Sequence, residues 1–163
     1  MRPVLVAALI AAGLGLLVSP GVGAPTAYEL DVPKRLTVTR GDSGAISLTI
    51  APRSGYTVSR EGPLRVDVSA VPDTGLALTK THYTRDDAVN AADAVANSPQ
   101  FDVGYEATLP GGYAVAIDVR FWICRKRTCR PVRETRTVDV AVEEPAPPAP
   151  SPTGDAGVAS DGA

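Results

Sequence analysis

Hydrophobic and polar residues alternate with a period of two along most of the chain between residues 35 and 142. The longest alternation places apolar side chains at the odd positions from Tyr113 to Ile123. Period-two alternation is typical of β-strands that have one buried face. Seven segments are therefore predicted to be strands: residues 35–39, 45–50, 64–68, 76–78, 101–109, 113–124 and 138–142.

Clusters of Gly, Pro, Asp and Ser separate these segments and supply the backbone conformations that turns require. Many short strands between such turns favour an all-β, immunoglobulin-like antiparallel sandwich of about seven strands. We expect residues 101–109 to pair with residues 113–124 through the Pro-Gly-Gly turn at 110–112. Residues 86–96 are rich in alanine and are predicted to form a short helical turn or a loop.

The first residues have the pattern of a secretory signal peptide. A basic start at Arg2 is followed by an apolar run over residues 4–18 and by small residues up to Ala24. The run is shorter than the ~20 residues of a membrane span, so no stable span is expected after signal removal. An uncleaved anchor remains an alternative, because Pro25 disfavours cleavage after Ala24.

The last residues have a different composition from the rest. Residues 144–163 consist largely of Pro, Ala, Gly, Ser and Asp, without aromatic residues or apolar periodicity. Such a segment buries too little surface to offset its ordering entropy, and we expect a disordered tail. Residues 1–24 are thus assigned to the signal peptide, and residues 26–143 to a single sandwich domain.

The net charge does not indicate a partner, whereas the signal peptide and the cysteines indicate a compartment. The chain has 16 basic and 18 acidic residues, so its net charge favours no particular partner, and no nucleic acid is expected. The signal peptide predicts a periplasmic or secreted protein. In an oxidising compartment the two cysteines are expected to pair.

Both cysteines lie in the short segment FWICRKRTCRP, residues 121–131. If the odd positions of residues 113–123 face the core, Asp118, Arg120, Trp122 and Cys124 share the outward face. Cys129 follows after four intervening residues, and Pro131 is expected to stop an immediate continuation of the strand. A hairpin tip crossed by a disulfide fits this spacing, since bridged Cα atoms lie about 4.4–6.8 Å apart.

Three interpretations of this tip remain open: a structural staple, a thiol–disulfide exchange site, and a solvated basic loop. A bridge that closes so few residues contributes only about 2 kcal/mol in the loop-entropy model. Exchange is favoured by neighbouring cations, which lower the pKa of a thiol, and by an accessible position. The candidate cations are Arg120, Arg125, Lys126, Arg127 and Arg130.

A family resemblance covers most of residues 35–142. The segment from Pro110-Gly111-Gly112 to Cys129-Arg130-Pro131, followed by Val138-Asp139-Val140, resembles the amino-terminal periplasmic domain of DsbD-type thiol–disulfide interchange proteins. This group is also called the disulfide-bond-corrector family. Residues 51–56 and 62–66 are similar to the family's Gly-Tyr/His segment and the Pro and strand that follow.

The resemblance implies an immunoglobulin-like fold in which Cys124 and Cys129 pass reducing equivalents to a periplasmic or extracellular redox partner. Cys129 would be the cysteine that first attacks a partner disulfide. His82-Tyr83 and Trp122 are the candidates for the family's aromatic shield over the cysteines. The membrane and thioredoxin-like domains of the interchange proteins have no counterpart among these residues, so the reductant would be another protein.

Other chemistry receives little support from the sequence. His82 is the only histidine, so a metal site lacks ligands, and no cofactor is expected. The leading hypothesis is an exported β-sandwich that takes part in thiol–disulfide exchange. The alternative is a non-enzymatic binding or structural module whose disulfide only shapes a basic loop.

Overall fold

The computed structural model describes residues 27–92 and 97–147 of the chain. The predicted signal peptide and residues 148–163 of the predicted tail lie outside these ranges. In the described part, no helix is long and apolar enough to span a membrane. The elements are β1 Tyr28–Asp31, β2 Arg35–Thr39, β3 Ser43–Pro52, β4 Thr57–Val58, β5 Arg65–Val71, β6 Leu76–Leu78, β7 His82–Thr84, the 3-10 helix η1 Arg85–Asp87, β8 Gln100–Ala107, β9 Gly111–Arg125 and β10 Thr128–Glu143.

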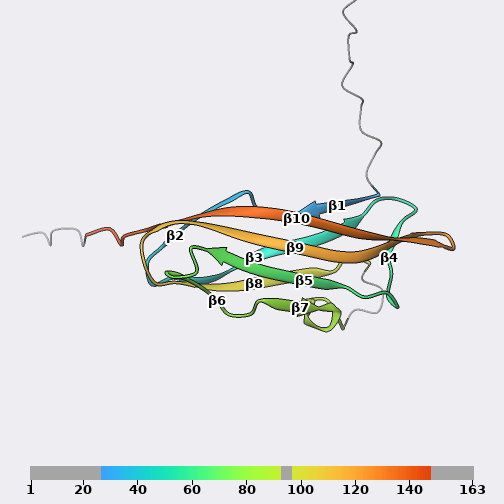
Figure 1. Cartoon of the computed structure of the whole chain (residues 1–163), viewed down its shortest axis with the longest axis horizontal. Coiled ribbons are helices and arrows are strands. Elements are labelled where there is room, and N and C mark those ends of the chain that lie inside the picture. The colour runs from blue at the N-terminus through green and yellow to red at the C-terminus, as the bar shows by residue number, and fades with distance from the viewer. Residues whose placement is uncertain (1–26, 93–96, 148–163) are drawn as a thin grey trace, which may run out of the picture.

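The strands form two stacked sheets (Figure 1). One sheet has the order β1-β3-β8-β6, and the other has the order β2-β10-β9-β5-β7, with β4 paired to the end of β9. The first order corresponds to strands A-B-E-D of an immunoglobulin domain, and β10-β9-β5 corresponds to G-F-C. The predicted immunoglobulin-like sandwich is confirmed.

The core consists of the inward-facing side chains of both sheets. Burial follows the predicted alternation in β3, β5, β8 and β9, where every second side chain is withdrawn from solvent. The largest fully buried side chains are Phe101, Phe121, Ile46, Leu48, Ile50, Leu76, Ile117, Ile123, Val66, Val103, Val115 and Val119. Alternation along single strands therefore predicted the core correctly.

The predicted hairpin between residues 101–109 and 113–124 is wrong. β8 pairs with β3 and β6, whereas β9 pairs with β10, β5 and β4 in the other sheet. The Pro-Gly-Gly segment therefore connects the two sheets. Both strands bury one apolar face, and that requirement is met equally well when they face each other across the core. Leu109, the last residue of the predicted strand 101–109, lies beyond the end of β8 and is 53% exposed.

A tyrosine corner stabilises this connection between the sheets. The Tyr113 hydroxyl donates a hydrogen bond of 2.8 Å to the carbonyl oxygen of Leu109. A tyrosine at the start of strand F makes this bond in immunoglobulin domains. Gly75 lies beneath the ring with a φ of +96°, and a Cβ there would stand 2.1 Å from the Tyr113 hydroxyl oxygen. The position two residues after the tyrosine, a cysteine in antibody domains, is the fully buried Val115.

Pro131 does not stop the strand as predicted, because β10 runs through it. The pairing of β9 with β10 keeps one register from Thr128 to Val142, without a bulge. The N–H of Asp139 donates to the carbonyl oxygen of Lys34, so the odd-numbered residues of β10 direct their main-chain groups away from β9. Proline lacks an N–H group, and at this position the missing group would have faced the strand edge.

Candidate functional site

The two cysteines form a disulfide at the tip of the β9–β10 hairpin. Cys124 and Cys129 are directly opposite each other, with their Cα atoms 4.0 Å apart and an S–S distance of 2.05 Å. Cys124 is half-buried and Cys129 is exposed. The turn consists of Lys126 and Arg127, and Lys126 has a φ of +55°, a region that most side chains avoid. The predicted bridged hairpin is confirmed.

A shallow hollow of about 520 Å³ opens beside the disulfide. The loop that begins at β4 forms one wall, and the hairpin tip, with Lys126 and Arg127, forms the other. β4 is held against the tip, because Thr57 pairs with Cys124 and the N–H of Val58 donates 3.0 Å to the Asn97 side chain. Both sulfur-bearing residues line this hollow, so the disulfide is accessible from outside.

The basic side chains of the tip are divided between its two faces. Lys126 and Arg127 share the hollow with the disulfide, together with Arg60 from the loop after β4. Arg125 and Arg130 line a different hollow, which Lys126 also borders, and the Arg125 guanidinium lies 5.4 Å from the centre of the Tyr56 ring. The predicted cationic surroundings of the sulfurs are thus only partly assembled on the disulfide's own side.

Two of the proposed shielding residues lie away from the disulfide. Tyr83 pairs through Val66 with Val119 of β9, five residues before Cys124, which corresponds to about 17 Å along a strand. Its ring is buried, with its centre 6.3 Å from that of Phe101. His82, one residue earlier, hydrogen-bonds to Asp67 at 2.5 Å. Only Trp122, which is 36% exposed, lies on the face and at the end of β9 where the disulfide is found.

Three arginines form a row across the outer face of this sheet. Arg65 of β5 is directly opposite Arg120 of β9, and Arg120 is directly opposite Arg133 of β10. Neighbouring strands lie about 4.8 Å apart, so the three side chains emerge close together. Like charges in register repel each other, and this row requires compensation by carboxylates.

A parallel row of carboxylates provides that compensation. Asp118 accepts from Arg120 Nε at 3.0 Å and from Arg133 Nη2 at 3.2 Å, while Asp67 accepts from Arg65 Nε at 2.8 Å. Partial burial raises the pKa of Asp118, but hydrogen bonds and charges from Arg120 and Arg133 outweigh it, so the pKa lies below its usual value. Asp118 serves two arginines, which leaves the row with one positive charge more than its two carboxylates neutralise.

An apolar groove of about 430 Å³ adjoins the arginine row. Its apolar part comes from Trp122, Pro131 and Pro63, and its charged border comes from Arg65, Arg120 and Arg133. Trp122 and Pro131 are directly opposite each other on β9 and β10, one row closer to the disulfide than the arginines. The groove therefore places an apolar surface beside a cationic one.

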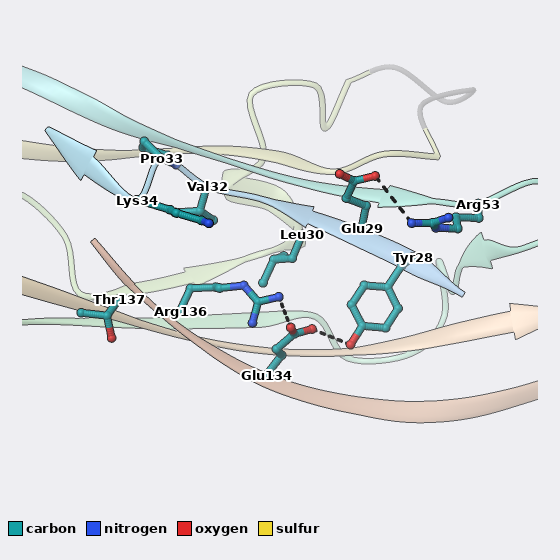
Figure 2. A pocket seen from close by; sticks show the side chains of 10 residues that line it. All are labelled: Tyr28, Glu29, Leu30, Val32, Pro33, Lys34, Arg53, Glu134, Arg136 and Thr137. Carbon is teal, nitrogen blue, oxygen red and sulfur yellow. Dashed lines mark hydrogen bonds and ion pairs between the residues drawn. The ribbon is translucent and has the colours of Figure 1, made fainter. Parts of the chain in front are cut away.

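A separate crevice of about 360 Å³ lies between β1 of one sheet and β10 of the other (Figure 2). Tyr28 donates a hydrogen bond of 2.5 Å from its hydroxyl to Glu134, which also pairs with Arg136. These two β10 residues occupy inward-facing positions between the buried Val132 and Val138. Burial, followed by the hydrogen bond and charge of Glu134, raises the pKa of Tyr28 to about 12.

This raised pKa makes the folded protein sensitive to alkali. Tyrosine in an unfolded chain ionises near pH 10, so the contribution of Tyr28 to stability is complete below that pH and is lost as the pH rises towards 12. In NMR of ¹³C-labelled tyrosine, we expect the Tyr28 ring to titrate near pH 12. In Glu134→Gln it should titrate at lower pH but still above 10, because burial is the larger cause. Titration of Tyr28 near pH 10 in the native protein would contradict this assignment.

Sequence reasoning missed Arg133, Glu134 and Arg136, and the reason is visible in the pattern. The alternation of apolar residues that marks a strand is interrupted at positions 134 and 136, where charges occupy inward positions. Arg65 lies in the predicted strand 64–68, but the sequence does not show which strands are its neighbours. Only an explicit search for a charged strand between Val132 and Val138 could have found these residues from the sequence.

Comparisons with known proteins find only distant structural matches. No family model matches the chain, and no curated protein matches it. Among solved structures, murine CRIg matches at 12% identity and a TM-score of 0.34, over 71% of this chain and 98% of its own. AggA, the major subunit of aggregative adherence fimbriae type I from Escherichia coli, has 12% identity and a TM-score of 0.35 over 71% and 93%. The CooA pilin subunit from enterotoxigenic Escherichia coli has 12% identity and a TM-score of 0.35 over 72% and 99%.

Proposed function

We propose that this chain is a non-enzymatic binding module in which the disulfide is a structural clasp for a basic hairpin. The supporting observation is the division of charge around the disulfide. Arg120 is engaged by Asp118, Arg125 lies over the Tyr56 ring, and Arg130 lines the hollow that Arg125 lines. A reactive cysteine is activated by cations gathered at its sulfur, and here several of the candidates serve other contacts.

The clasp has a clear mechanical role at this position. The turn contains no glycine, and Lys126 adopts a left-handed conformation at its first residue. A cross-strand disulfide next to this turn holds β9 and β10 in register where the hairpin extends past β4 (Figure 1). It thereby fixes the basic tip and the adjacent outer face in one shape. A disulfide of this kind suits an oxidising compartment outside the cytosol.

A second candidate function is thiol–disulfide exchange, as the resemblance to the disulfide-bond-corrector family implies. It is favoured by the exposure of Cys129 and by the hollow that Lys126, Arg127 and Arg60 line beside it. In that reaction a dithiol protein would reduce the disulfide. The Cys129 thiolate would then attack a partner disulfide, form a mixed disulfide and release one partner thiolate. Attack by Cys124 would release the second, so two electrons would pass to the partner and the disulfide would re-form.

A redox titration with mass-spectrometric thiol counting separates the two functions. For the binding module, we expect the disulfide to remain closed at the potential of thioredoxin, about −270 mV, and to open only below about −300 mV. Half-reduction at −270 mV or at a less negative potential would contradict the structural role and support exchange.

The variant Lys126→Gln/Arg127→Gln is the matched control for this titration. It removes two cations beside the disulfide and keeps both cysteines. If exchange is the function, the variant should react more slowly with a protein dithiol, because fewer cations stabilise the cysteine thiolate that leaves when the disulfide opens. If the disulfide is only a clasp, native protein and variant should both resist reduction at −270 mV.

A further inference from the structure

The outer edge of β10 is unpaired over most of its length. β2 pairs with it only from Asp139 to Glu143. Between the hairpin tip and Asp139, the odd-numbered residues direct their main-chain groups away from β9. Among the described residues, the N–H groups of Arg133, Thr135 and Thr137 have no hydrogen-bond partner, and all three residues are exposed. A row of free donors and acceptors of this kind is a template for another strand.

The charges along this edge select which strand could pair with it. On the outer face, an added strand would extend the row Arg65–Arg120–Arg133, so the residue placed opposite Arg133 would meet a cation. A carboxylate there forms a favourable cross-strand pair, whereas a basic side chain is repelled. A second copy of β10 paired antiparallel about Arg133 would set the two Arg133 side chains opposite each other, and their repulsion acts against that register.

We propose that the free edge of β10 binds an extended, acidic segment of a partner polypeptide by strand addition. The free main-chain groups favour a polypeptide over an acidic saccharide, because a peptide backbone supplies donors and acceptors at the same spacing. The residue opposite Arg133 is acidic, and main-chain pairing extends from there towards Thr137. This inference rests on the proposed function as a binding module and names its ligand class.

Pro131 sets the limit of the added ladder. It offers no N–H at the edge, so main-chain pairing continues from Arg133 towards Thr137 and is interrupted towards the tip. A proline on an edge strand also restricts indiscriminate pairing. The edge therefore offers a short run of free main-chain donors and acceptors together with the positive charge of Arg133. This combination gives selectivity for acidic segments.

The direct test is a titration of the full bridged chain with a decapeptide of alternating valine and glutamate. The valine–lysine decapeptide and oligogalacturonate are the comparison probes. We expect binding of the acidic peptide only. We also expect the amides of Arg133, Thr135 and Thr137 to become protected from hydrogen exchange when it binds, because their N–H groups enter the new ladder.

Three variants test the geometry of this edge. Arg133→Glu should weaken binding of the acidic peptide about tenfold and allow the lysine peptide to bind, because the sign of the facing charge is reversed. Asp118→Asn should strengthen binding of the acidic peptide, because Arg133 loses its carboxylate partner. Thr135→Pro removes one outward N–H and should weaken binding by roughly three- to tenfold while β9–β10 pairing is retained.

Four results would overturn the inference. They are absence of acidic-peptide binding, binding without amide protection, equal binding of oligogalacturonate, and protection of these amides already in the free chain. The last result would assign the edge to another segment of this chain or, if sedimentation shows a dimer, to a second copy. None of these results alters the redox titration, so failure of the edge proposal is distinguishable from failure of the proposed function.

Discussion

Replacing Phe121 with alanine is expected to lower the free energy of unfolding by about 3–5 kcal/mol, which is the range for large-to-small changes at buried aromatic positions. Phe121 is 1% exposed, and its ring meets the Tyr28 ring edge to face with centres 5.0 Å apart. It lies where β9 of one sheet faces β1 of the other, so the cavity would open between the sheets. Urea denaturation monitored by circular dichroism measures the loss.

Trp122→Ala provides the matched control for this substitution. Trp122 is the next residue on the same strand, but it faces outward and is 36% exposed. Its truncation is expected to cost only about 1–2 kcal/mol, since most of the lost surface is not core surface. Equal losses for the two variants would contradict the assignment of Phe121 to the core and Trp122 to the outer face.

The double substitution Cys124→Ser/Cys129→Ser is expected to lower the free energy of unfolding by about 2 kcal/mol and to leave the sandwich folded. The loss is moderate because the disulfide closes a loop of sequence separation 5 and therefore restricts little of the unfolded chain. The core does not depend on it, since Ile123 and the buried residues before it pack without contribution from the sulfurs. Denaturant titration of oxidised and doubly substituted protein measures this difference.

Hydrogen exchange adds a local measurement to this comparison. In the double variant, we expect faster exchange at the hairpin tip and unchanged exchange at the centres of β9 and β3. The reason is that the disulfide joins β9 and β10 only at the tip of their hairpin. Native protein reduced with dithiothreitol under denaturing conditions and then refolded is the control for the serine side chains. Global unfolding of the variant would show that the disulfide is indispensable to the fold, contrary to this prediction.

The buried face of each long strand follows from the amino-acid sequence alone. Alternation in β3, β8 and β9 predicted buried positions such as Ile46, Phe101 and Ile117, and it placed Arg120, Trp122 and Cys124 on the outward face. This succeeds because the period of side chains in a strand is fixed by backbone geometry and does not depend on the partner strand. The spacing of the cysteines likewise predicted the bridged hairpin.

The neighbours of each strand, in contrast, become known only from the folded arrangement. The placement of β8 and β9 in different sheets and the parallel pairing of β2 with β10 leave no periodic trace in the sequence. The same is true of the arginine row and of the unpaired edge of β10, because a row across strands brings together residues that are distant in the chain. The physical reason is that alternation specifies a buried face, while hydrogen-bond partners and register are set by how the sheets pack.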